Sequence, residues 1–175
     1  MNTLFLDTAK KKSTGQSTPD FLKLFNTYSE KLKSDRGTCA MVRRAASINQ
    51  LLDEPAFYRL VGSLGYEYSQ REQWARVVFC LCLPKVRHIE GGLSLGAALS
   101  HDGRIKDRRL FQVLRSEPPH DMTQLRRLIL FVDPALDWVK AATALWYWGE
   151  HTRRRLLEEF ILYQPASDAV KEVNH

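Results

Sequence analysis

The 175-residue sequence has three cysteines and no apolar run near the ~20 residues that a transmembrane helix requires. Cysteines that are so few, and odd in number, do not form a disulfide framework. Cys80 and Cys82 lie two residues apart in an expected helix, point to different faces and cannot grip one metal, so we interpret them as core residues. At the start, MNTLFLDTAKKK places lysines after a short apolar patch, the reverse of a secretory signal. These absences predict a cytoplasmic protein that does not enter a membrane.

The sequence also lacks the motifs of common enzyme classes. It contains no glycine-rich phosphate loop, no Gly-x-Ser-x-Gly turn and no Cys/His nucleophile pair. Two His-Asp dipeptides, His101-Asp102 and His120-Asp121, leave open a metal phosphohydrolase of the HD type. The first lies in a glycine-containing turn and Asp121 fits a helix cap, so neither suits a metal ligand on an ordered helix. We therefore expect no catalytic residue, no metal and no cofactor.

Helical periodicity is present along nearly the whole chain, and no segment shows the strict alternation of a half-buried strand. We predict an all-α fold. Caps, breakers and apolar spacing place helices from Pro19 until Gly37 and at 39–46, 55–64, 70–83, 93–99, 107–115, 121–132, 134–148 and 150–163. Capping boxes are expected at Ser69–Glu72 and at Asp121–Gln124.

Composition and link lengths predict the domain organisation. Residues 1–17 contain KKKSTGQST and little to bury, which predicts a flexible tail. We expect two small helical bundles packed together, an N-terminal one over 18–100 and a C-terminal one over 101–164. Very short links in the second imply antiparallel neighbours. The polar residues 165–175 are expected to fray.

Positive charge is in excess: the formal net charge is +6, and sixteen of the 26 cationic residues are arginine. Arginine offers a planar fork for phosphate oxygens and stacks on bases, whereas lysine acts as a point charge. A basic, arginine-rich protein therefore favours a phosphate-rich partner.

The stretch HDGRIKDRRLFQVLR, residues 101–115, concentrates this charge. On a helix that begins at Asp107, Arg108 and Arg115 are seven residues apart and within about 20 degrees of one another, opposite an apolar arc. Arg109 flanks that arc, and Arg104 lies in the entry turn. Residues 108–116 contain no acid, so the usual support from Asp or Glu four residues away is missing.

Other basic clusters carry different expectations. Arg126 and Arg127 add charge to the following helix, while Arg43-Arg44 and the loop with Lys85 and Arg87 are weaker candidates, because short basic pairs are common on any surface. The triplet at 153–155 has glutamates four residues away and is interpreted as a self-neutralised helix face. The tryptophans at 138, 146 and 148 favour core or interface over base stacking.

Several longer strings together resemble the CasB family, the small subunit of the type I-E CRISPR surveillance complex, Cascade. The strings are PAFYRLV (55–61), RVVFCL (76–81), SLGAALS (94–100), GRIKDRRLFQVLR (103–115), DMTQLRRL (121–128), PALDW (134–138) and WYWGEHTRRRLLEEFIL (146–162). They extend in order through residues 21–163.

The resemblance implies two small helical bundles, present as two copies packed head to tail in a crRNA-guided complex. Its implied partners are the backbone, large and crRNA-processing subunits, the crRNA-target DNA heteroduplex and the displaced non-target single strand. Cleavage is left to a recruited helicase-nuclease. The matched basic motifs supply the candidate contacts Arg43, Arg44, Lys85, Arg87, Arg104, Arg108, Arg109, Arg115, Arg126 and Arg127.

Residues and resemblance lead to one hypothesis, a non-catalytic subunit that binds nucleic acid without sequence specificity and stabilises the R-loop in antiviral defence. Phosphate contacts suit a displaced strand of any sequence. Two alternatives stay open: a purely structural scaffold whose arginines meet acidic subunits, and the HD-type phosphohydrolase.

Overall fold

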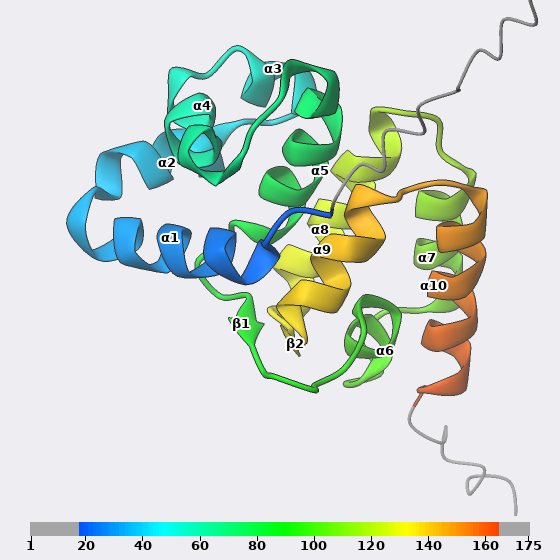
Figure 1. The fold of residues 1–175 in the computed structure, drawn as a ribbon. Coiled ribbons are helices and arrows are strands. Elements are labelled where there is room, and N and C mark those ends of the chain that lie inside the picture. Colours follow the sequence, from blue (N-terminus) through cyan, green and yellow to red (C-terminus); the bar gives the residue numbers. More distant parts are fainter. Residues whose placement is uncertain (1–17, 165–175) are drawn as a thin grey trace, which may run out of the picture.

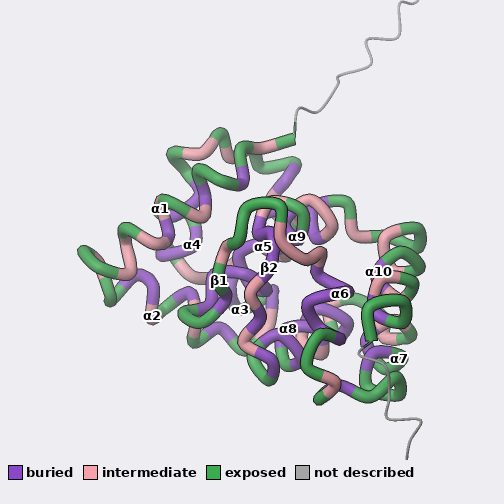
Figure 2. The backbone as a smooth tube through the Cα atoms, turned by 90° about the horizontal axis from the view of Figure 1, so that it is seen from below, coloured by how far each residue is buried: buried purple, intermediate pink, exposed green. Residues whose placement is uncertain are grey.

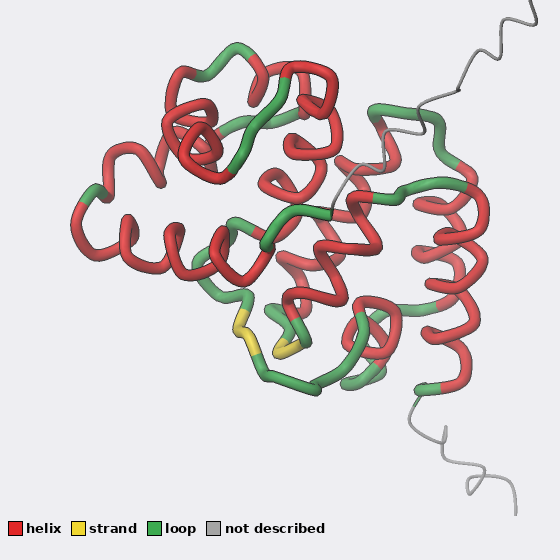
Figure 3. Tube along the Cα trace, in the orientation of Figure 1, coloured by secondary structure: helices red, strands yellow, loops and turns green. Residues whose placement is uncertain are grey.

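Helices form almost all the regular structure of this computed structural model, which describes residues 18–164 (Figures 1 and 3). The predicted tails, 1–17 and 165–175, lie outside the described residues. The α-helices within 18–164 are α1 (Phe21–Ser34), α2 (Arg36–Arg44), α3 (Ile48–Leu52), α4 (Pro55–Val61), α5 (Arg71–Leu81), α6 (Leu95–Ser100), α7 (Asp107–Arg115), α8 (His120–Val132), α9 (Trp138–Trp146) and α10 (Glu150–Leu162). The all-α prediction is confirmed. None of the described helices is both long and apolar enough to cross a membrane.

The core is built around α5, which is buried from Trp74 to Leu81 except at Arg76. Helices α2, α3 and α4 pack on α5 from one side and α8 and α9 from the other. In Figure 2 buried residues gather along α5 and α6, while α7 and α10 expose their outer sides. Such all-round burial requires an apolar sequence on every face, and AxVVFCLCL supplies it.

One hydrophobic cluster includes residues from both predicted bundles. Helix α6, on the N-terminal side of the predicted boundary at residue 100, packs against α10. Gly96 permits this approach, because a Cβ there would lie 2.5 Å from the Leu156 carbonyl oxygen. The division into 18–100 and 101–164 stays a prediction, since packing is continuous across it.

A pair of two-residue strands was not predicted, and one of them corrects the helix expected over 134–148, because that helix begins only at Trp138. Strand β1 (Arg87–His88) pairs in parallel with β2 (Ala135–Leu136). The backbone N–H of Ile89 donates to the Leu136 carbonyl at 2.8 Å. The His88 ring nitrogen Nδ1 accepts from the Trp138 backbone N–H at 3.1 Å, so the segment after α5 is fastened to the start of α9.

Several local predictions are wrong at helix ends. Asp20 caps α1 by accepting from Lys23 N–H at 2.9 Å, so Thr18-Pro19 is not the helix start. Helix α1 ends at Ser34, and Gly37 lies inside α2 because Asp35 caps a new helix there. The predicted capping box at Ser69–Glu72 does not form, since a 3-10 turn leads into α5 without a side-chain cap.

Candidate nucleic-acid interface

Helix α7 has the range predicted for it and carries the candidate arginines on its outer side. Leu110 and Val113 are buried, while Arg108, Arg109 and Arg115 are exposed. Their orientation follows from the amphipathic spacing, because an inward apolar stripe turns the remaining positions to solvent.

Contacts at both ends show that α7 lies antiparallel to α8 and α10. The Arg104 guanidinium donates to the carbonyl of Val132, the last residue of α8, at 2.9 Å. At the other end, Arg153 near the start of α10 donates to the Leu114 carbonyl at 3.1 Å. Gln164, just past α10, reaches Asp107 at 2.6 Å. Helices α8 and α10 thus flank α7 and leave its outer face uncovered within the described residues.

The exposed cations of α7 lack acidic partners. Arg108, Arg109 and Arg115 make no ion pair within residues 18–164, and neither does Arg127 on α8. Seven residues of helix separate Arg108 from Arg115 by about 10 Å along the axis. The Arg115 guanidinium carbon lies 5.3 Å from the centre of the Phe111 ring. We call Arg108, Arg109, Arg115 and Arg127 the α7/α8 basic surface.

Arg104 borders this surface but is partly neutralised. Its Nε donates to Asp102, whose pKa is lowered: burial raises it, but the hydrogen bonds and positive charge of Arg104 outweigh that effect. Its guanidinium carbon lies 5.2 Å from the centre of the Phe131 ring, and that of Arg109 lies 5.3 Å from the same centre. The ion pair and the Val132 carbonyl fix Arg104 in place.

Arg126 is not a surface residue, which corrects its expected place among the contacts. Its exposed fraction is 8%. Its guanidinium donates to the Phe79 carbonyl at 2.7 Å and to the Arg43 carbonyl at 2.5 Å, and burial lowers its pKa. Because these donors serve the ends of α5 and α2, Arg126 holds three helices together.

The remaining candidates lie in two places. Arg44 is exposed at the end of α2, while half-buried Arg43 donates to the Cys39 carbonyl at 3.2 Å. Lys85 pairs with Asp133 at 3.1 Å, just beyond α8, and Arg87 is exposed in β1. The Arg126–Arg43 bond brings the end of α2 against α8, so Arg44 and Lys85 both lie at the margins of α8.

Comparison with known proteins identifies the family. A family model described as CRISPR-associated protein Cse2 matches residues 38–160. The chain belongs to the Cse2 (CasB) family. This confirms the resemblance found in the sequence.

Individual relatives agree with this assignment. The CRISPR system Cascade subunit CasB of Escherichia coli (strain K12) is 44% identical over 137 residues, which cover 73% of this chain and 86% of that protein. A chain in the crystal structure of E. coli Cascade bound to a PAM-containing dsDNA target superposes with a TM-score of 0.79 at 41% identity, covering 84% of this chain and 97% of that one. CasB from Thermus thermophilus shares the fold, with a TM-score of 0.62 at 16% identity over 82% of this chain and 99% of that one.

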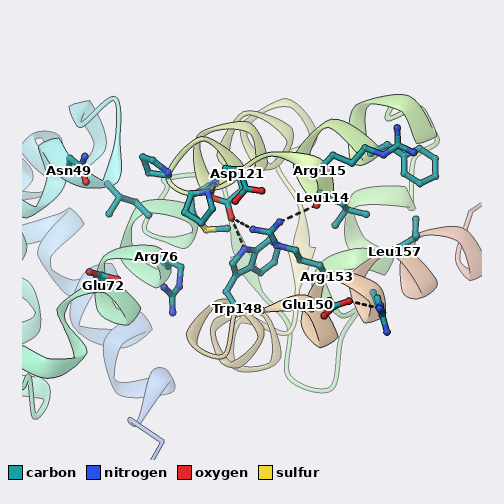
Figure 4. Close-up of a pocket in the computed structure, with 18 of the residues that line it drawn as sticks. Asn49, Glu72, Arg76, Leu114, Arg115, Asp121, Trp148, Glu150, Arg153 and Leu157 are labelled. Carbon is teal, nitrogen blue, oxygen red and sulfur yellow. Dashed lines mark hydrogen bonds and ion pairs between the residues drawn. The ribbon is translucent and has the colours of Figure 1, made fainter.

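In this Cse2 family member the triplet at 153–155 differs from its predicted role at one position. Arg154 pairs with Glu150 and Arg155 with Glu159, as their spacing predicts. Arg153 instead turns inward to Asp121, whose exposed fraction is 1%, at 2.6 Å (Figure 4). Asp121 also accepts from the Trp148 indole N–H at 2.9 Å. The predicted capping box at Asp121 is therefore wrong, because that carboxylate joins α8 to α10.

Asp121, Trp148 and Arg153 also line a groove of about 830 Å³. Asn49 and Arg76 lie on one side of the groove, and Leu114 and Leu157 lie across from them (Figure 4). Arg76 is half-buried, and burial lowers its pKa, while its guanidinium donates to the Leu145 and Trp146 carbonyls at 3.0 Å each. Arg115 of the α7/α8 basic surface stands at the edge of this groove, but Glu72, Glu117 and Glu150 also line it, so the charge of the groove is mixed.

The two His-Asp dipeptides lie at opposite ends of α8. Asp102 is joined through Arg104 to Val132 at the end of the helix, whereas Asp121 lies in its first turn. Asp121 and Val132 are eleven positions apart in the helix, about 16 Å along its axis, so the two dipeptides are too far apart to share a metal. Within residues 18–164 no group of three or more His, Cys, Asp or Glu side chains is arranged to hold a metal ion.

Proposed function

We propose that this protein is the non-catalytic small subunit of a type I-E Cascade complex. Its α7/α8 basic surface holds the displaced non-target DNA strand and so stabilises the R-loop. One observation carries this proposal: four exposed arginines on two adjoining helices have no ion-pair partner within residues 18–164. The similarity to a chain of a DNA-bound Cascade supports the setting.

The chemistry of the surface suits a strand of any sequence. Guanidinium groups pair with phosphate oxygens, which are the same at every nucleotide, so the contact needs no base identity. Opening a duplex against a guide RNA is nearly balanced in free energy. A few phosphate contacts on the released strand therefore favour the open state. Backbone, large and crRNA-processing subunits, a second copy of this chain and the crRNA-target heteroduplex are the partners in this proposal.

The test is an Arg108→Ala/Arg115→Ala variant in a Cascade assembled with guide RNA and bound to target DNA. We expect normal assembly, faster R-loop collapse and a salt slope shallower by about 1.4, at ~0.7 per lost single-strand phosphate contact. Arg154→Ala/Arg155→Ala is the matched control, because it removes two arginines that glutamates already neutralise. R-loop lifetimes equal to wild type at every salt concentration would contradict the proposal.

The purely structural alternative predicts a different outcome. If the arginines meet acidic protein surfaces, the double variant assembles poorly while its assembled fraction keeps a normal R-loop. A photoreactive non-target strand separates the two cases directly. Adducts on α7 or α8 support strand contact, and their absence supports the scaffold role.

A further inference from the structure

The last turn of α8 exposes two large apolar side chains inside a cationic region. Leu130 is 45% exposed and Phe131 is 43% exposed. The other apolar residues of this turn, Leu128, Ile129 and Val132, are buried against the core. The packing of α8 against the core therefore does not require the Phe131 side chain.

Guanidinium groups surround the Phe131 ring. Arg104 and Arg109 lie 5.2 and 5.3 Å from its centre, and Arg127 precedes it by one helical turn on the same face. Asp102 and Val132 fix Arg104. Arg109 has no side-chain hydrogen bond or ion pair within the described residues, so it can turn from the ring to a phosphate and uncover the aromatic surface.

An exposed aromatic ring with arginines around it suits a nucleotide better than a protein segment. A phosphate meets the arginines while its base stacks on the ring, and every base has a face for such stacking. The groove near Trp148 shows the contrast, since glutamates line it beside the arginines and offset their attraction for a phosphate backbone. A duplex cannot offer a base face to Phe131, because its bases are stacked on one another until a base is flipped out.

We propose that Phe131 stacks on one unpaired base of the bound strand while Arg109 takes a neighbouring phosphate. This inference rests on the proposed function, and it makes Phe131 the residue that selects single-stranded over double-stranded DNA. The contact adds affinity without adding a charge, so it does not contribute to the salt dependence.

The experiment measures binding of the full-length protein to three labelled 20-mers: oligothymidylate, an abasic strand with the same phosphates, and a duplex. Phe131→Ala is expected to weaken oligothymidylate binding at least about fivefold and to leave the abasic strand unchanged, with the salt slope unaltered. Phe131→Trp should restore the affinity. Tyr68→Ala is the matched control, because the Arg71 guanidinium lies 4.5 Å from the centre of that exposed ring on another part of the molecule.

Each outcome decides something. Equal loss for oligothymidylate and the abasic strand would mean that Phe131 only positions Arg104 and Arg109, and would overturn stacking. No loss for either strand would overturn it as well. If the wild type binds none of the three probes, the proposed nucleic-acid surface fails together with the inference. If the wild type binds both single strands and Phe131→Ala binds them with the same affinity, the inference fails and the proposed function stands.

Discussion

Replacing Arg126 by methionine should strongly lower the free energy of unfolding of the protein. This effect requires no nucleic acid. Methionine keeps an unbranched apolar side chain in the buried site but cannot donate to the Phe79 and Arg43 carbonyls. A hydrogen bond from a charged group contributes ~1.5 kcal/mol at the low end, so losing two costs about 3 kcal/mol. Domains of this kind have free energies of unfolding of ~5–15 kcal/mol, which makes this a large fraction.

Urea denaturation followed by circular dichroism measures the change. With a slope of ~2 kcal/mol per molar urea, the midpoint should fall by about 1.5 M. The neighbouring Arg127→Met supplies the control, since Arg127 is exposed, and its unfolding free energy should stay within ~0.5 kcal/mol of wild type. An Arg126→Met protein as stable as wild type, with only strand binding reduced, would refute the structural role.

Two further predictions concern packing and pH. Gly96→Ala should lower the unfolding free energy by ~1–3 kcal/mol in urea melts, because the new Cβ meets the Leu156 carbonyl; Gly62→Ala, with nothing within 4 Å, should change it by less than ~1 kcal/mol. Burial raises the Asp137 pKa, but bonds from Lys140 outweigh it and leave that pKa lowered. Its stabilisation is therefore present above pH ~4 and lost in acid, so Asp137→Asn should differ most from wild type at pH 7 and least near pH 2.

The sequence predicts the long helices well because their apolar spacing records which face is buried. Helix α7 has the predicted bounds, and α10 ends one residue before the predicted Tyr163. The five-residue α3 was missed, since so short a segment shows no period. The β1–β2 pair is only two residues long, and its pairing depends on segments 48 residues apart. No local pattern encodes such a contact.

The site was predictable in part. The exposure of Arg108, Arg109 and Arg115 follows from the helical period. The burial of Arg126 and the exposure of Arg127 do not. Both are arginines in one helix, and only the position of α2 and α5 decides that Arg126 is covered. The exposure of Phe131 was not predicted, because an apolar residue in LRRLILFV is expected to lie in the core.

The arginine content has a structural explanation that a charge count misses. The carbonyls in the last turn of a helix have no partner within it and carry partial negative charge. Within residues 18–164, five helices have such carbonyls bonded by an arginine from another segment. Arg126 donates to α2 and α5, Arg153 to α7, Arg104 to α8 and Arg76 to α9. A planar fork can reach two carbonyls at once, which a lysine ammonium on a flexible stem does not reproduce. The arginines available to a DNA strand are therefore those that do not bond the carbonyls of a helix end. Contact with the strand thus depends on the exposed arginines of α7 and α8 rather than on the net charge of the protein.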